Sequence, residues 1–352
     1  MTASKAFEIG GRSVPPWQRE RIELPVASLY TNTPVVLPVQ VVNGKESGPK
    51  LFVSAALHGD EIIGVEIIRR LLKLPALDDL RGTLLAIPVV NTLAFLHQSR
   101  YLPDRRDLNR SFPGSDSGSL AARLANLFIK EVVSRCDYGI DLHTGAVRRP
   151  NLPQIRGDLA NPETLRLCRA FGVPLVLNSE PTEGTLREYT TKKGIPVILY
   201  ESSEALTFDE VCIRIGVQGV LNVLYELQML PRPKDAPKAA FEPVIARSST
   251  WVRSPGSGVA RSQVGLGDVV RTGQLMAIVS DPIGESENKV VSPANGVVIG
   301  RLNLPLVYEG DALFHVARVE DPDAVGKALE RMHARSRREV PEGVHAGEPP
   351  IV

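Results

Sequence analysis

Two patterns of apolar and polar positions alternate over the first two thirds of the chain. Short runs of mostly apolar residues, such as 50–57 and 82–90, predict buried strands. Longer stretches with apolar residues at helical spacing, such as 61–74 and 119–136, predict amphipathic helices. Strands that alternate with helices are typical of an α/β sheet with helices on both faces. We therefore expect an α/β fold up to about residue 230.

The pattern changes beyond that point. Residues 231–243 are rich in Pro, Lys and Ala and show no periodicity, which indicates a linker. Short valine-rich stretches follow, and the motif Ser-Pro-x-x-Gly-Val begins at Ser254 and again at Ser292. Two similar halves predict a small all-β domain, either a barrel or a sandwich. The predicted parts are an α/β domain over 1–235, a β-domain over 236–320, and a short helix with a mobile tail over 321–352.

Composition restricts the classes of function. The chain has 352 residues, of which 43% are hydrophobic and 23% are charged, as in an ordinary soluble globular protein. Its formal net charge of +1 gives no electrostatic reason to expect binding to nucleic acid or to a membrane. There is no apolar run of ~18 residues and no apolar N-terminal segment. The three cysteines are few and widely spaced, so we expect a reduced, cytoplasmic protein whose chemistry rests on His and carboxylate groups.

A histidine and two acids directly follow the first of these predicted strands, in the stretch Ser-Ala-Ala-Leu-His-Gly-Asp-Glu. His58 and Glu61 lie at its carboxyl end, where α/β sheets bind their ligands. His143 ends a second predicted strand, and Asp141 lies on the same side of it. Two His and one carboxylate are typical ligands of catalytic Zn²⁺, and a nearby acid can orient one of them. The alternative is a polar loop that contains a histidine by chance.

A polar, turn-rich segment at 97–115 contains three side chains that are good hydrogen-bond donors, Arg100, Asn109 and Arg110. Such planar or forked donors suit a carboxylate or a developing oxyanion. A solvated basic loop is the simpler interpretation of this segment taken alone.

Another acid, Glu201, ends the apolar strand predicted at 195–202. A carboxylate at the end of a buried strand is costly unless it faces a cleft or has a partner. It is well placed to act as the general base toward a metal-activated water. The alternatives are a helix cap or an ion pair with an arginine, and Glu204 is a second candidate for the base.

These motifs, in the order His-Gly-Asp-Glu, Arg-Tyr, Asp-Leu-Asn-Arg-Ser-Phe-Pro-Gly, Asp-Leu-His-Thr-Gly and a strand-end Glu, resemble the succinylglutamate desuccinylase/aspartoacylase family. That family is a branch of the zinc carboxypeptidase-like fold. The resemblance covers roughly residues 30–230 and implies a carboxypeptidase-like mixed sheet flanked by helices. It implies one Zn²⁺ per chain, held by His58, Glu61 and His143.

The resemblance also implies roles in handling a substrate. Arg100 would polarise the scissile carbonyl, and Asn109 with Arg110 would hold the substrate carboxylate. Glu201 would be the general base. The implied enzyme is a zinc-dependent deacylase that removes a small acyl group from an N-acyl amino acid or N-acyl diamino acid.

Two other functions stay open. A zinc carboxypeptidase acting on short peptides would use the same motifs, because both substrates carry a carboxylate. A non-catalytic zinc- or ligand-binding module is the second alternative, although ligands, base and arginines are all present.

The predicted β-domain resembles the biotinyl/lipoyl "hammerhead" fold. Lys289 lies near the position of that fold's modified lysine, so a carrier of an acyl group or biotin is an alternative function of this domain. Its neighbours lack the flanking pattern of such a site, and a structural or oligomerisation domain is favoured. Because free sheet edges are often covered by a partner, we also expect that a homo-oligomer can form.

Overall fold

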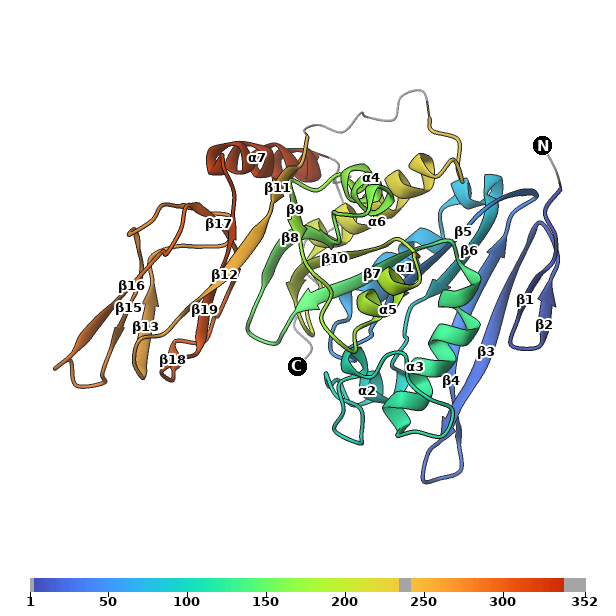
Figure 1. Ribbon diagram of the computed structural model, residues 1–352, viewed down its shortest axis with the longest axis horizontal. Helices are drawn as coiled ribbons and strands as arrows, with labels where there is room; N and C mark the ends of the chain where they lie inside the picture. The colour runs from blue at the N-terminus through green and yellow to red at the C-terminus, as the bar shows by residue number, and fades with distance from the viewer. Residues whose placement is uncertain (1–2, 234–241, 339–352) are drawn as a thin grey trace.

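The computed structural model describes residues 3–233 and 242–338. These residues form a mixed α/β structure built on one sheet of 13 strands, together with a four-stranded sheet and a two-stranded sheet (Figure 1). The main path of the large sheet runs in space through β12 (Ser248–Arg253), β19 (Ala312–Arg318), β17 (Gly296–Arg301), β8 (Asn151–Gly157), β10 (Val197–Glu204), β7 (Tyr138–Gly145), β5 (Glu46–Ala55), β6 (Arg81–Ile87), β4 (Pro34–Asn43) and β3 (Gln18–Ser28). Three strands join it off this path, β9 (Leu175–Asn178), β11 (Val244–Ala246) and β14 (Val269–Val270).

The centre of the large sheet is parallel. Strand β5 pairs in parallel with β6 and β7, and β7 pairs in parallel with β10. Antiparallel strands β4 and β8 lie outside this centre on either side. The carboxyl ends of β5, β7 and β10 therefore meet at one edge of the sheet, as the strand predictions required.

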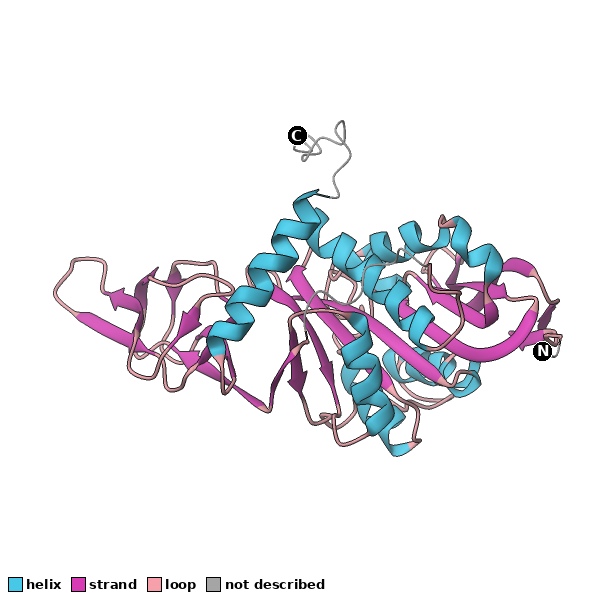
Figure 2. Ribbon diagram, turned by 90° about the horizontal axis from the view of Figure 1, so that it is seen from above, coloured by secondary structure: helices cyan, strands magenta, loops and turns pink. Residues whose placement is uncertain are grey.

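Helices cover both faces of the sheet, as Figure 2 shows. One face packs against α1 (Ile63–Leu72), α4 (Pro162–Phe171) and α6 (Glu210–Glu226), and the other against α2 (Thr92–Leu96), α3 (Leu120–Glu131) and α5 (Leu186–Lys192). Neighbouring residues of β5 show the division, because Phe52 packs with the α3 side and Val53 with the α1 side. The predicted helices are present, and two of them begin at a side-chain cap. Asp209 accepts a hydrogen bond from the Cys212 amide, and Ser119 accepts one from the Ala122 amide.

The C-terminal strands from β12 to β19 form a lobe, called the β-lobe below, that extends from one end of the large sheet (Figures 1 and 2). Its second sheet consists of β16 (Glu287–Val291), β15 (Leu275–Ser280), β13 (Gly258–Ser262) and β18 (Leu306–Val307). The repeated motif adopts the same turn twice. The Ser254 hydroxyl donates to the Gly256 carbonyl and the Ser292 hydroxyl donates to the Ala294 carbonyl, each at 2.7 Å.

This β-lobe is joined to the large sheet by strand pairing and by a shared core. Strand β11 pairs with β9, and β17 pairs with β8. Helix α7 (Pro322–Arg338) places Val325 and Leu329 in the same apolar core as α1 and α6. The division of the chain into three parts stays a prediction, and most of the predicted linker and the tail after 338 lie outside the described residues.

The remaining two strands, β1 (Phe7–Ile9) and β2 (Arg12–Val14), form a hairpin near the N-terminus. None of the helices in the described part of the chain is both long and apolar enough to cross a membrane.

Candidate active site

The register of the central strands brings the chemistry-bearing side chains together. Ser54 of β5 lies beside Asp141 of β7, and Glu201 of β10 lies beside His143 of β7. Residues paired in register share one face of a sheet. His58 follows β5 by three residues, in the turn that leads into α1. Side chains from three separate strand ends therefore meet on the face that is covered by α5.

His58, Glu61 and His143 form a buried cluster, with relative exposures of 3%, 2% and 4%. The Nδ1 atoms of His58 and His143 each lie 2.7 Å from one oxygen of the Glu61 carboxylate. One possible ligand atom from each residue lies within 4.8 Å of those of the other two, so the group could hold a metal ion. The structure thus brings together all three residues that the sequence predicted as ligands.

Two further carboxylates hold the outer nitrogens of the histidines. The His143 Nε2 atom lies 2.7 Å from Asp141, which also accepts a hydrogen bond from the Ser54 hydroxyl at 2.7 Å. The His58 Nε2 atom lies 3.1 Å from Asp107. Metal-ligating histidines usually donate their second nitrogen to such a group, which fixes the ring. The donor set and its surroundings therefore fit a divalent metal with nitrogen and oxygen ligands.

Asp107 was not among the residues that the sequence singled out. It begins the short 3-10 helix Leu108–Arg110 and accepts the Asn109 amide at 2.8 Å. A polar Asp-Leu-Asn stretch was the only signal available, and it is also explained by this capping role.

The cluster has strong internal electrostatics. Burial raises the pKa of Glu61, but the two imidazoles outweigh it and hold the pKa well below its usual range. Burial lowers the pKa of His143, but Asp141 and Glu61 outweigh it, so that pKa is raised well above the usual value. The pKa of His58 is raised in the same way by Glu61 and Asp107, against the effect of burial. The carboxylates thus make the pocket favourable for positive charge, which a metal cation would supply.

Arg100 reaches the cluster. Its Nη1 atom lies 3.3 Å from a Glu61 oxygen and its Nη2 atom donates to Asp107 at 2.9 Å. Its side chain is 30% exposed, so the guanidinium lies at the border between the buried cluster and solvent. This position is compatible with a contact to a substrate carbonyl.

The two residues predicted to hold the substrate carboxylate are placed differently from each other. The Asn109 side-chain oxygen accepts the Leu186 amide at 3.0 Å and so ties the loop to α5. Arg110 is exposed, and its Nη1 atom donates to the Asn109 carbonyl at 2.6 Å. Their role in substrate binding stays a prediction.

The predicted base, Glu201, is 14% exposed and has a partner on each oxygen. Asn151 donates to one oxygen at 2.7 Å, and the Nε atom of Arg156 lies 3.3 Å from the other. Glu204, the other candidate, accepts the Arg148 amide at 2.9 Å and is engaged in holding a loop. Sequence reasoning missed Asn151, whose contact with Glu201 depends on the pairing of β8 with β10.

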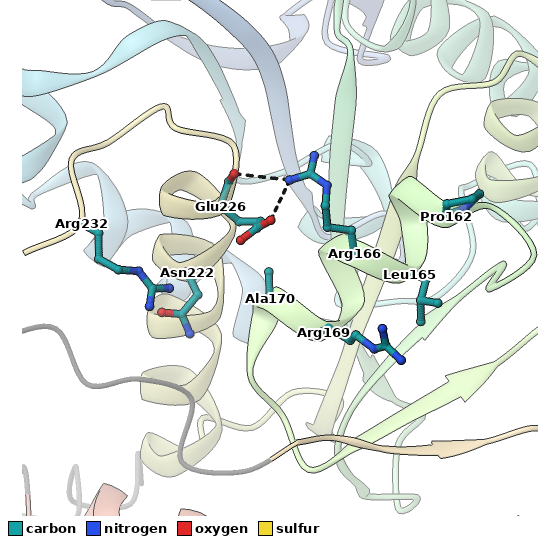
Figure 3. A pocket seen from close by; sticks show the side chains of 8 residues that line it. All are labelled: Pro162, Leu165, Arg166, Arg169, Ala170, Asn222, Glu226 and Arg232. Atoms are coloured by element: carbon teal, nitrogen blue, oxygen red, sulfur yellow. Dashed lines mark hydrogen bonds and ion pairs between the residues drawn. The ribbon is translucent and has the colours of Figure 1, made fainter.

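A separate surface pocket of about 520 Å³ lies over α4 and α6 (Figure 3). Figure 3 shows Arg166 paired with Glu226, and Arg169 and Arg232 at the sides of the pocket. Because α4 and α6 cover the other face of the sheet, this pocket contains none of the cluster residues.

Comparisons with known proteins identify the family of the chain. The profile of the succinylglutamate desuccinylase/aspartoacylase catalytic domain matches residues 47–227. An N-alpha-acetyl-L-2,4-diaminobutyric acid deacetylase from Halomonas elongata is 27% identical over 299 residues, which are 81% of this chain and 86% of that protein.

Solved structures show the same fold. The product-bound ectoine utilization protein from Ruegeria pomeroyi has a TM-score of 0.76 at 24% identity, covering 86% of this chain and 95% of its own. The succinylglutamate desuccinylase/aspartoacylase from Rhodobacter sphaeroides gives the same values. The names of the family describe removal of an acyl group, which places these proteins among the amide-hydrolysing enzymes. Because the catalytic-domain match covers more than half of the chain and includes the whole cluster, the protein belongs to the succinylglutamate desuccinylase/aspartoacylase family.

Proposed function

We propose that this protein is a zinc-dependent deacylase that releases a small acyl group from an N-acyl amino acid or N-acyl diamino acid. The buried His58–Glu61–His143 cluster, with Glu201 beside it in the sheet, is the observation that carries the proposal. Family membership supports the deacylase class. The named activity of the Halomonas relative makes an N-acetyl diamino acid the first substrate to try.

The three cluster residues would hold Zn²⁺ through two imidazole nitrogens and one carboxylate. Bound zinc would supply a Lewis acid and lower the pKa of a coordinated water toward ~7. The chain's own groups would do the rest. Glu201 would accept a proton from the attacking water and return it to the leaving amine, as a general base and then a general acid. Arg100 would stabilise the negative charge that develops on the carbonyl oxygen.

Recognition of the substrate carboxylate is assigned to Asn109 and Arg110. The exposed guanidinium of Arg110 can turn toward a ligand, because its hydrogen bond is to the carbonyl of the neighbouring Asn109. Asn109 would keep the loop in place through its bond to the Leu186 amide.

The test is release of primary amine from a panel of N-acetyl and N-succinyl amino acids, N-acyl diamino acids and short peptides, with and without a chelator. We expect chelator-sensitive release from the small N-acyl compounds, restored by added Zn²⁺. Release from peptides alone would replace the deacylase with a carboxypeptidase. A zinc-loaded protein that released nothing from the whole panel would favour a binding module.

A further inference from the structure

The β-lobe meets the catalytic sheet at the loop that joins β7 to β8. Strand β17 and the residues after it run alongside this loop. Gly300 pairs with Asn151, the Arg301 amide donates to the Pro150 carbonyl at 3.3 Å, and the Asn303 amide donates to the Arg148 carbonyl at 2.8 Å. These backbone contacts of the β-lobe therefore fix the segment that leads directly into β8.

Asn151, the first residue of β8, contacts both the β-lobe and the predicted base. Asn151 is 8% exposed, and its Nδ2 atom donates to the Glu201 Oε1 atom at 2.7 Å. Its Oδ1 atom lies over Gly300, where a Cβ atom would come within 2.6 Å of it. A glycine at position 300 thus leaves the space in which the Asn151 amide turns its nitrogen toward Glu201.

The partners of Glu201 explain why such a support is needed. The carboxylate is partly exposed, and the Arg156 Nε atom lies 3.3 Å from its second oxygen, longer than a close ion-pair contact. The Asn151 contact is the shorter of the two and has hydrogen-bond geometry, whereas the Arg156 Nε atom makes no hydrogen bond to any residue that the structure describes. A displacement of about 1 Å in a catalytic group can cost roughly 100-fold in rate.

We infer that Asn151 is a positioning residue for Glu201, and that the β-lobe holds it in place through Gly300 of β17. The lobe is then part of the catalytic apparatus, because it holds the residue that positions the base. This inference rests on the proposed function, because it takes Glu201 as the base.

The test compares four variants of the zinc-loaded protein on the best substrate of the panel. Asn151→Ala removes the donor, and Asn151→Leu removes it while keeping the approximate size of the side chain and adding no charge. Gly300→Ala places a Cβ against the amide. Asn303→Ala is the matched control. That asparagine belongs to the same contact between the β-lobe and the β7–β8 loop, but its side chain donates to Glu204 at 3.4 Å.

We expect both Asn151 variants to lose about 10- to 100-fold in kcat while KM stays within about threefold and the zinc content stays unchanged. Gly300→Ala should lose kcat in the same direction, and Asn303→Ala should stay within about threefold of the wild type. A packing role would tolerate the similarly sized Asn151→Leu change, so an active Leu variant would overturn the inference. Equal losses in Asn151→Ala and Asn303→Ala would also overturn it.

A crystal structure of zinc-loaded Asn151→Ala beside the wild type gives a readout that does not depend on activity. We expect one Glu201 conformation in the wild type and a displaced or multiple conformation in the variant. An unchanged Glu201 would contradict the inference. A wild-type protein without chelator-sensitive hydrolysis would instead contradict the proposed function, and the two failures are therefore distinguishable.

Discussion

Each histidine of the cluster uses its two ring nitrogens differently. Nδ1 faces Glu61, and Nε2 faces an outer carboxylate, Asp141 for one ring and Asp107 for the other. An outer carboxylate fixes the ring and raises its basicity as a ligand.

We therefore predict that Asp141→Asn weakens zinc binding by about 10- to 100-fold, because the amide no longer carries the charge that supports His143. The zinc dissociation constant is measured by competition with a chelating dye. Asp78→Asn is the control, since Asp78 is exposed and pairs with Arg19 on the surface. Equal zinc affinities in the Asp141 variant and the wild type would remove Asp141 from this role.

The two candidate bases are separated by their surroundings. Glu201 lies beside His143, whereas Glu204 holds the Arg148 amide and Asn303. Glu201→Gln should keep one zinc per chain and lose about 10²- to 10⁴-fold in kcat, because a general base typically contributes that much. Glu204→Gln should stay within about threefold of the wild type. Reversal of these two results would assign the base to Glu204.

The residues that could be predicted from the sequence are those whose motif carries its own chemistry. His58, Glu61 and His143 are metal-ligand residue types at or just after the ends of apolar strands, so their convergence followed from the α/β pattern. Asp107 and Asn151 act through contacts with residues about 50 positions away in the chain. Their letters alone are compatible with ordinary caps and turns, which is why sequence reasoning passed over them.

At the scale of elements, α1 lies unusually close to the sheet. A Cβ on Gly64 would come within 2.6 Å of the Ala55 Cβ and 2.7 Å of the Leu142 Cβ. Glu61 lies just before this helix, so the depth of α1 also sets the position of a predicted ligand.

Gly64→Ala should therefore lower the free energy of unfolding by about 1–3 kcal/mol and weaken zinc binding, because the helix must move away from β5 and β7. Urea unfolding with and without zinc measures both effects. Gly326→Ala in α7 is the control, because a Cβ there meets only the Val269 side chain at 3.6 Å and alanine favours a helix. A Gly64 variant as stable as the wild type would contradict this packing.

The pairing of β12 with β19 buries a titratable side chain. His315 stacks on Trp251 with ring centroids 4.1 Å apart, and its Nε2 atom lies 2.7 Å from the Ser249 hydroxyl. Burial, and secondarily Arg156, lower the pKa of His315 to about 3. The native state then keeps this ring neutral, while an unfolded chain protonates it below about pH 6.5.

Above about pH 6.5 this histidine does not lower the free energy of unfolding, because the ring is neutral in both states. As the pH falls from there toward 3, the free energy of unfolding decreases, because only the unfolded chain takes up the proton. In His315→Gln, the drop in unfolding free energy between pH 7 and pH 5 should be smaller than in the wild type by up to about 2 kcal/mol. Urea unfolding at the two pH values measures it. Equal drops in both proteins would contradict the buried, neutral state of this histidine.

Element types followed from the apolar periodicity, but the joining of the β-lobe to the sheet did not. The strands predicted after residue 243 are present. Their connection to β8 is a single residue pair between positions 151 and 300, and no local pattern encodes it. Periodicity reports which face of a strand is buried and gives no partner strand.

For the whole molecule, the shared core has a consequence for stability. Ala246, Val297 and Val325 from the C-terminal part belong to the same apolar cluster as Ile67 and Val223. A chain cut to residues 1–233 would expose one side of this cluster to water.

We predict that this shortened chain loses the cooperative thermal transition of the full-length protein, whereas the full-length protein retains it. Calorimetry of the two chains tests this. A shortened chain with an intact transition would mean that the α/β part folds on its own. The cytoplasmic location and the homo-oligomer remain predictions at this scale.

Titration of the metal-free protein with Zn²⁺, followed by the rate of amine release from the best N-acyl amino acid, tests the central claim most directly. The rate should rise in proportion to added zinc up to one ion per chain and then stay constant, and Glu61→Gln should abolish this response by removing a ligand. Full hydrolysis by the metal-free protein, or a rate unaffected by zinc, would contradict a zinc-dependent deacylase.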